Sequence, residues 1–235
     1  MSSQNSGPEK KLAIRNWQDF AQIIDHTQLR PEATADQIVR LCEEAAEYSF
    51  GAVMVNACYV GLASSKLQGS EIRVGATIGF PLGATLTNVK VFEAGEAIKL
   101  GAREIDMVMN IGALKSGNRE LVLSDIRAVA ESVHVQKSLL KVILETVLLT
   151  NDEKVLACEI SEKAGADFVK TSTGFLSGVA TVEDVALMRR AVTIGVKASG
   201  GIRTAVDARK MVEAGANRLG TSSGVNIIRE LRSLS

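Results

Sequence analysis

The chain has 235 residues, of which 46% are apolar and 4% aromatic, a length and composition typical of one α/β domain with a core of valine, isoleucine, leucine and alanine. Lysine plus arginine and aspartate plus glutamate both number 27, so there is no net positive charge to favour nucleic acid or a membrane as a partner. Three separated cysteines and two histidines without a short-spaced partner argue against a disulfide framework and a metal site, and the absence of a long apolar run or a secretory leader predicts a soluble, cytoplasmic protein.

Residues 1–15 are mostly polar and have no periodic apolar pattern, so we expect a flexible segment before one folded domain over residues 16–235. In that domain, short apolar runs alternate with amphipathic stretches, which is typical of repeated strand-then-helix units. Eight runs are expected to be strands: IIDHT (23–27), AVMVNAC (52–58), RVGATIGF (73–80), EIDMVMN (104–110), VILET (142–146), ADFVKTST (166–173), VKAS (196–199) and RLGTSS (218–223). This count predicts a single-domain (β/α)8 TIM barrel.

Gly-Ala pairs recur along the chain at Gly51, Gly101, Gly165 and Gly215. Each precedes an even-numbered run, where glycine can take the left-handed conformation that ends a helix and alanine lets the next strand pack closely. The spacing therefore favours βαβα quarters of a barrel, although unrelated helix-ending glycines would give the same pairs. A doubly wound open sheet is the alternative fold, and no G-x-G-x-x-G follows the first run to support it.

Two lysines lie near the carboxyl ends of apolar runs, where TIM barrels form their active sites. Lys170 stands in FVKTST and Lys197 in VKAS, and if both face inward their ammonium groups approach to roughly 4 to 6 Å across neighbouring strands. Their repulsion lowers one lysine pKa by about two units, which gives a neutral amine suited to Schiff-base formation. Two salt-bridged lysines that bind an anion without chemistry are the alternative.

Two carboxylates also lie late in runs. Asp106 shares a strand face with Val108 and Asn110, so we expect it to point into the barrel, where it can transfer protons and offset the lysine charges. A purely structural Asp–Lys ion pair is the alternative. Asp25, in the first run, is a second inward candidate, although it is equally suited to cap a turn through Thr27.

Small residues gather after the last three runs. Gly174 follows the sixth, Gly200 and Gly201 the seventh, and Ser222 and Ser223 close the eighth. Barrel enzymes often bind phosphate on backbone N–H groups in these loops, so we expect a phosphate site here, although tight turns alone explain any one of the glycines. Cys58, at the expected end of the second strand, is close enough to the mouth to react with aldehydes, and simple packing is the alternative.

Five ordered motifs resemble the deoxyribose-phosphate aldolase family: IDHT, EIDMVMNIGAL, FVKTSTGF, VKASGGIRT and LGTSSG, over Ile24 to Ser223. The resemblance implies a class I aldolase that reversibly cleaves 2-deoxy-D-ribose 5-phosphate to D-glyceraldehyde 3-phosphate and acetaldehyde in deoxyribonucleoside catabolism, without a cofactor. It also implies that Lys170 forms the Schiff base, that Lys197 lowers its pKa and that Asp106 transfers protons, with Asp25 in a supporting role.

The chain departs from some family members at two places. Where those members carry a phosphate-binding lysine after TSTG, this chain has Phe175, so phosphate recognition is expected to rely on backbone amides and on Ser222 and Ser223. Some members also have a longer tail that ends in a proton-transferring tyrosine, whereas this sequence ends in LRSLS. The rival interpretations are another Schiff-base barrel aldolase, and a sugar-phosphate sensor that has lost turnover. A homo-oligomer is left open.

Overall fold

The computed structural model describes residue 14, residues 16–176 and residues 178–233. In this part of the chain, parallel strands form one closed barrel in sequence order, and the last strand pairs with the first. The strands are β1 (Ile24–Gln28), β2 (Ala52–Val55), β3 (Arg73–Ile78), β4 (Glu104–Val108), β5 (Leu139–Ile143), β6 (Phe168–Lys170), β7 (Gly195–Ser199) and β8 (Arg218–Thr221). The predicted (β/α)8 barrel is confirmed, and the open-sheet alternative is wrong.

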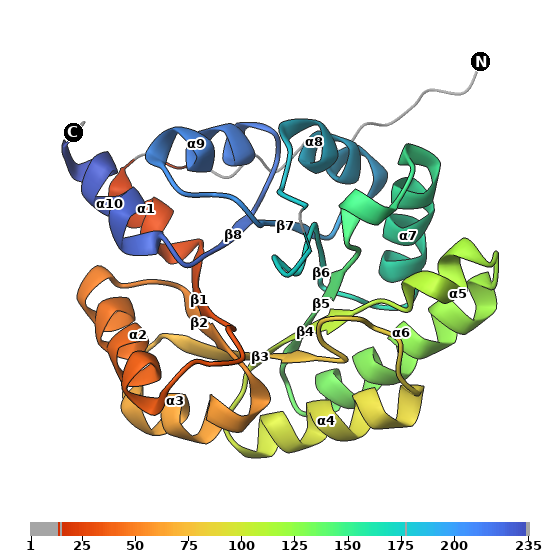
Figure 1. The fold of residues 1–235 in the computed structure, drawn as a ribbon, viewed down its shortest axis with the longest axis horizontal. Helices are drawn as coiled ribbons and strands as arrows, with labels where there is room; N and C mark the ends of the chain where they lie inside the picture. The colour runs from red at the N-terminus through yellow and green to blue at the C-terminus, as the bar shows by residue number, and fades with distance from the viewer. Residues whose placement is uncertain (1–13, 15, 177, 234–235) are drawn as a thin grey trace.

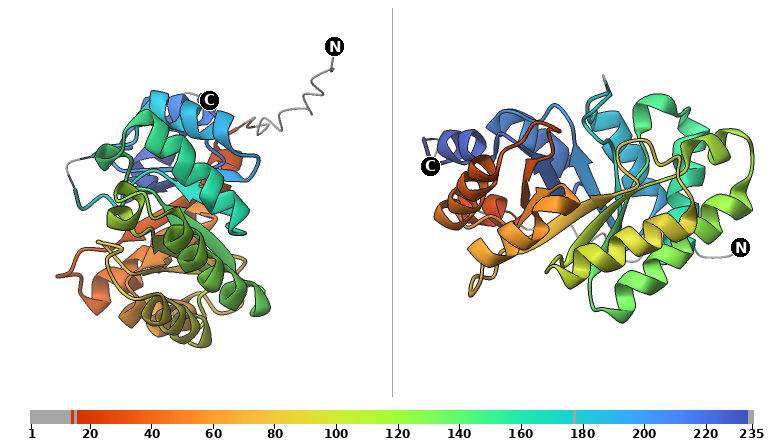
Figure 2. Two further views of the ribbon diagram at one scale, coloured as in Figure 1. Left: turned by 90° about the vertical axis from the view of Figure 1, so that its right-hand side faces the viewer. Right: turned by 60° about the horizontal axis from the view of Figure 1, so that its bottom comes forward.

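Helices surround the strands on the outside, as the view along the barrel and the turned views show (Figure 1, Figure 2). They are α1 (Trp17–Gln22), α2 (Ala35–Tyr48), α3 (Val60–Lys66), α4 (Thr87–Lys99), α5 (Ile111–Lys115), α6 (Arg119–Val135), α7 (Asn151–Lys163), α8 (Val182–Ala191), α9 (Ala205–Glu213) and α10 (Gly224–Ser233), with 3₁₀ turns η1 (Ala57–Tyr59) and η2 (Thr146–Leu148). Threonine side chains begin several of them: Thr34, Thr150 and Thr204 each form a reciprocal capping box with the residue three positions on.

The apolar core lies between the barrel and its helices. Along β4, Ile105 and Met107 are fully buried with the rest of this core, while Glu104 and Asp106 alternate with them and form ion pairs with residues of other strands. Because side chains alternate along a strand, one face of the sheet supplies the hydrophobic layer and the other fills the barrel. The interior of this barrel is therefore rich in charge.

Most strands end earlier than the sequence predicts. β2 ends at Val55 rather than Cys58, β3 at Ile78, β4 at Val108, β5 at Ile143, β6 at Lys170 and β8 at Thr221. The polar residues at the ends of the predicted runs begin the following segments instead: the Asn110 side chain accepts a hydrogen bond from the backbone N–H of Ala113 at 3.0 Å and caps α5, and Thr146 starts η2. Side chains that satisfy helix termini compete with the strand ladder for these positions.

The Gly-Ala pairs do precede β2, β4, β6 and β8. Gly101, Gly165 and Gly215 have positive φ values of 114°, 94° and 110°, as expected for residues that end helices. Gly51 differs, because Ser49 takes the left-handed position after α2 with φ 55°. Gly51 is needed for a close approach instead: a Cβ there would lie 2.1 Å from the carbonyl oxygen of Gln22.

The first and last described helices pack together. α10 contacts α1, α2 and α9, and Figure 1 shows α1 and α10 side by side. α1 begins after Asn16, whose side chain accepts a hydrogen bond from Asp19 N at 2.9 Å. The flexible segment predicted at residues 1–15 lies outside the described residues, apart from Ile14. Of the helices described, none has the length and apolar character needed to cross a membrane.

Candidate active site

Three side chains singled out in the sequence meet inside the barrel. Lys170 and Lys197 are register partners on β6 and β7, and both donate a hydrogen bond to the same Oδ2 atom of Asp106, each at 2.8 Å. The two lysine nitrogens are therefore separated by no more than twice that distance. All three side chains are buried, with Lys170 3% exposed. This cluster joins two lysines and one carboxylate, with Lys170 at the carboxyl end of β6 and with Asp106 and Lys197 at the middle of β4 and β7.

Asp25 belongs to the same cluster. Its Oδ2 atom lies 2.5 Å from Lys197 Nζ, and its Oδ1 atom accepts hydrogen bonds from both Nε and Nη2 of Arg218, the former at 2.9 Å. The Thr27 hydroxyl bonds to the backbone carbonyl of Asp25, not to its carboxylate. The Asp25 side chain is thus engaged in the barrel interior rather than in a turn.

Sequence reasoning missed three further charged residues in the barrel. Lys141 Nζ lies 2.9 Å from Asp106 Oδ1 and 2.5 Å from Glu104 Oε2, and Arg218 Nη2 lies 3.1 Å from Glu104 Oε2. Lys141 and Glu104 are fully buried, and Arg218 nearly so. The signal that identified Lys170, a charged residue at an alternate position of an apolar strand, is also present in LLKVI and EIDMV. Lys141 falls outside the predicted fifth run, which starts at Val142 whereas β5 starts at Leu139, and Glu104 and Arg218 lie at the amino ends of their strands.

The environment of Lys170 raises the neutral fraction of its amine by lowering the pKa. Burial lowers its pKa to about 8, the Asp106 carboxylate opposes that shift, and the charges of Lys197 and Lys141 add to it. The repulsion expected from Lys197 contributes to the lowered pKa, but burial is its largest cause. Burial disfavours the charge of Asp106, but the three surrounding lysines outweigh it and hold its pKa well below the usual range. Asp106 therefore stays ionised and offsets the positive charge of the lysines around it.

The loops expected to bind phosphate lie next to one another. Lys170 pairs with Lys197 and Ser199 with Gly220, so the segments after β6, β7 and β8 leave adjacent strand ends. Gly174, Gly200 and Gly201 all have positive φ values. In the described residues, no hydrogen bond uses the backbone N–H of Gly174, Gly201 or Ser222. These N–H groups meet the chemical requirement for an anion site.

Besides its positive φ, Gly201 is restricted by the loop after β6. A Cβ at Gly201 would meet Cγ1 of Val179 at 2.6 Å, so Val179 would have to move to admit a side chain at this position. Gly201 is still exposed, as are Gly174 and Ser222, while Ser223 is half-buried and its backbone N–H donates to Thr221 Oγ1 at 2.9 Å. Of the predicted set, Gly174, Gly201 and Ser222 are the most accessible to a ligand.

The side chain of Glu145 forms hydrogen bonds with the loop after β6. Glu145 is buried with a left-handed φ of 58°, and its Oε2 atom accepts hydrogen bonds from the backbone N–H of Thr173, at 3.1 Å, and from the Thr173 hydroxyl. Phe175, two residues on, is half-exposed and meets Phe80 edge to face, with 5.0 Å between ring centroids. Phe175, directly after the TSTG run, therefore contacts an aromatic side chain.

Cys58 does not lie at the end of β2. The strand stops at Val55, and the chain turns into η1, where Cys58 is exposed. Asn56, between them, leaves the sheet and donates its side-chain N–H to the carbonyl of Leu29 at 3.2 Å. Reaction of this thiol with aldehydes remains a hypothesis, and it fails if mass spectrometry finds Cys58 unmodified after long incubation with excess acetaldehyde while activity declines.

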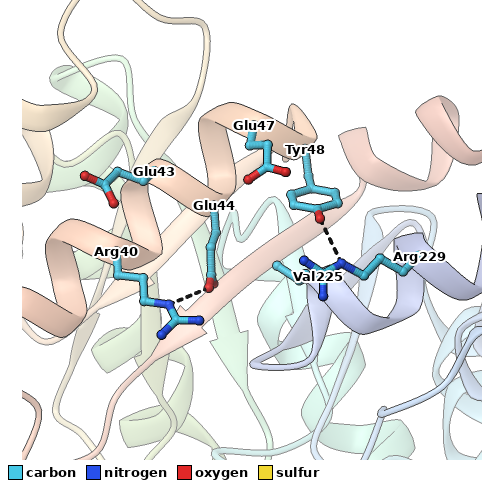
Figure 3. Close-up of a pocket in the computed structure, with 7 residues that line it drawn as sticks. All are labelled: Arg40, Glu43, Glu44, Glu47, Tyr48, Val225 and Arg229. Atoms are coloured by element: carbon cyan, nitrogen blue, oxygen red, sulfur yellow. Dashed lines mark hydrogen bonds and ion pairs between the residues drawn. The ribbon is translucent and has the colours of Figure 1, made fainter.

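A surface cleft of about 340 Å³ lies elsewhere, between α2 and α10 (Figure 3). Its two arginines are paired with neighbours: Arg40 Nε lies 2.9 Å from Glu44 Oε1, and Arg229 donates to the Tyr48 hydroxyl at 3.0 Å. Glu44 also bonds His26 at 2.8 Å. The titratable cluster in the barrel is the better candidate site. Among the described residues, no group of histidine, cysteine, aspartate and glutamate side chains is arranged to hold a metal ion.

Comparison with known proteins gives one family. A model of DeoC/LacD family aldolases matches residues 20–230. The chain is 60% identical over 208 residues to a deoxyribose-phosphate aldolase of Streptococcus gordonii, covering 88% of this chain and 94% of that one, and 55% identical over 219 residues to one of a Thermoanaerobacter species, covering 92% and 98%. It also resembles the deoxyribose phosphate aldolase from Aeropyrum pernix, whose structure is tetrameric, with 34% identity, a TM-score of 0.87 and 94% of each chain covered.

Proposed function

This chain belongs to the DeoC/LacD family of aldolases, as a deoxyribose-phosphate aldolase, and from that premise we propose that it reversibly cleaves 2-deoxy-D-ribose 5-phosphate to D-glyceraldehyde 3-phosphate and acetaldehyde through a Schiff base on Lys170. The observation that carries the mechanism is the buried Lys170 amine, with its pKa lowered to about 8, in a hydrogen bond to the Asp106 carboxylate. Roughly a tenth of such an amine is neutral at pH 7, and a neutral amine is the form that attacks a carbonyl.

In the cleavage direction, Lys170 attacks the C1 aldehyde carbon of the open-chain sugar phosphate and forms a carbinolamine. Asp106, acting with water, moves the protons that allow the C1 hydroxyl to leave as water, which gives an iminium ion. The 3-hydroxyl then loses its proton, C3 becomes an aldehyde, and the C2–C3 electron pair passes into the iminium. This step releases glyceraldehyde 3-phosphate and leaves an enamine on Lys170, so the lysine adduct is the electron sink and no cofactor is needed.

The second half of the reaction regenerates the amine. The enamine takes a proton at C2 to become an iminium again, and water adds to C1 and releases acetaldehyde. Lys197 and Asp25 act next to these steps: Lys197 carries a positive charge that disfavours protonation of Lys170, and Asp25 lies 2.5 Å from Lys197 Nζ and holds it. The proposed physiological context is cytoplasmic catabolism of deoxyribonucleosides.

The decisive experiment is reductive trapping of the unmutated protein. Borohydride added with deoxyribose 5-phosphate should fix a two-carbon or five-carbon adduct on the peptide that contains Lys170. Substrate panels separate the rival aldolases, because a transaldolase-like or keto-acid-specific enzyme would prefer other donors. A sensor without turnover would bind the sugar phosphate and give no reduced adduct, which would refute the proposal.

Phosphate recognition is proposed for the loops after β6, β7 and β8, with Gly174, Gly200, Gly201, Ser222 and Ser223 around the anion. Ser222→Asp places a negative charge beside the accessible N–H groups, so KM for deoxyribose 5-phosphate should rise about ten- to a hundredfold by charge repulsion. Steady-state kinetics should show little change for unphosphorylated 2-deoxyribose, the matched substrate. Equal effects on both substrates would place the phosphate elsewhere, as would a ligand structure with the phosphate away from β7 and β8.

Self-association is a separate part of the proposal. The Aeropyrum relative is a tetramer, and α4 of this chain, with the segment before it, presents exposed apolar side chains at Leu82, Leu86 and Phe92. We propose a homo-oligomer, which light scattering of the purified protein can measure.

A further inference from the structure

Charged side chains lie in contact with one another from Lys170, at the carboxyl end of β6, to the amino ends of β3 and β4. Asp106 links Lys170 to Lys141, and Lys141 in turn pairs with Glu104 at 2.5 Å. Glu104 also pairs with Arg73 at 3.1 Å, and the Arg73 side chain, at the start of β3, is 44% exposed. A continuous chain of ion pairs thus connects the candidate nucleophile with the surface at the opposite end of the strands.

A second route runs around the barrel wall. Lys197 pairs with Asp25, and Asp25 accepts hydrogen bonds from Arg218. Arg218 also contacts Glu104, at 3.1 Å from Oε2. The two routes therefore meet at the contact between Glu104 and Arg218, and Arg218 is the residue of the cluster that lies most contacts away from Lys170.

The charges of this buried set balance only if one of its cationic side chains is neutral, and the contacts of the four single out Lys170. The set contains three carboxylates and four cationic side chains, and all of them are buried: Asp25, Glu104, Asp106, Lys141, Lys170, Lys197 and Arg218. An uncompensated charge is costly in such an environment. Lys170 is the member next to the candidate substrate site, and the other three cations are each held by at least two carboxylates.

We propose that Glu104 and Arg218 are positioning residues that set the proton affinity of the Lys170 amine through this charge balance, without contacting the substrate. The proposal rests on the Schiff-base function above. The groups that face Lys170 are Asp106 of β4, Lys141 of β5, Lys197 of β7 and, through Lys197, Asp25 of β1. Glu104 holds Lys141, and Arg218 holds Asp25.

Two charge-neutralising variants should move the pH profile in opposite directions. Glu104→Gln removes a negative charge, so the remaining cations hold Lys170 neutral to lower pH. Arg218→Met removes a positive charge, so Lys170 keeps its proton to higher pH. The acid limb of kcat/KM, which reports the free enzyme, should shift down by about half to one pH unit in the first variant and up by a similar amount in the second.

Three further variants separate charge from structural damage. The double variant Glu104→Gln with Arg218→Met restores the balance and should bring the limb back toward its original position. Arg218→Lys keeps the charge and should leave the limb within about 0.2 pH unit. Lys90→Met removes an equally buried cation outside the barrel, paired with Asp125 at 2.6 Å, and should lower the melting temperature without moving the limb.

Arg73→Glu tests the same proposal if a variant at a buried position does not fold. Arg73 is half-exposed, so the variant should fold, and its negative charge beside Glu104 should move the limb up by a smaller amount. The proposal is overturned if the acid limb of kcat/KM shifts in the same direction in Glu104→Gln and Arg218→Met. It is also overturned if the limb does not move in a folded Arg73→Glu and does not move in either of the two buried variants. Borohydride trapping on Lys170 separates the Schiff-base function from the positioning role of Glu104 and Arg218. If trapping succeeds while the acid limb stays fixed, only the positioning role is refuted.

Discussion

Lys170→Ala is expected to abolish the borohydride-trappable adduct and to lower turnover by about four orders of magnitude or more, as loss of a covalent nucleophile does in other enzymes. The reason is geometric. Lys170 is the lysine of the cluster whose side chain is slightly exposed, whereas Lys141 and Lys197 are fully buried and each contacts more than one carboxylate. Steady-state cleavage of deoxyribose 5-phosphate and peptide mapping after reduction measure the two effects.

Lys99→Ala is the matched control, since Lys99 is exposed on α4 and its partner is Glu96 on the same helix. It should keep both turnover and the adduct. An adduct that maps to Lys197 in the unmutated protein would reverse the two roles. An adduct that persists in a folded Lys170→Ala would show that another amine reaches the carbonyl.

Lys197→Leu should reduce activity near pH 7 by roughly ten- to a thousandfold, with partial recovery at higher pH. Loss of this positive charge removes repulsion from Lys170, so the Lys170 pKa rises from about 8 toward the ordinary lysine value near 10.4. The protonated, unreactive form then dominates at pH 7, and raising the pH restores the neutral amine. The acid limb of kcat/KM should therefore move upward, while reduced adduct still maps to Lys170.

The same substitution leaves two buried carboxylates, Asp25 and Asp106, with fewer partners, so the protein should also be less stable, by about 3 to 5 kcal/mol. Lys197→Arg is the charge-preserving comparison and should move the limb less than Lys197→Leu. A folded Lys197→Leu with an unchanged limb would mean that burial alone, the largest cause of the lowered Lys170 pKa, sets the proton affinity.

The fold and the location of the charged cluster could be predicted because both depend on local patterns. Alternation along a strand placed Lys170, Lys197 and Asp106 on inward faces, and the rule that barrels bind ligands at strand carboxyl ends selected them. Strand ends were predicted too late, because Asn110 and Thr146 were included in strands although they begin α5 and η2. Whether a polar residue ends a strand or starts a turn depends on partners that a single sequence does not identify.

The contact between Glu104 and Arg218 could be identified only from the closed barrel. Glu104 and Arg218 lie at the beginnings of β4 and β8 and contact each other across the interior. No spacing in the sequence predicts a contact of that kind. Glu145 was missed for a different reason. Its left-handed backbone is unusual for a residue other than glycine, and its bonds to Thr173 depend on the course of the loop after β6.

The bond between Asp25 and Arg218 joins residues 193 positions apart in the chain, and this separation bears on how the protein can be made. Asp25 is synthesised long before Arg218, so the carboxylate of β1 has no guanidinium partner until β8 has been made, whereas Glu104 of β4 already has Arg73 of β3. Half-barrels built during translation would enclose unbalanced charge. Closure of the barrel therefore has to wait for β8, and until then the earlier strands need protection from other unfolded chains.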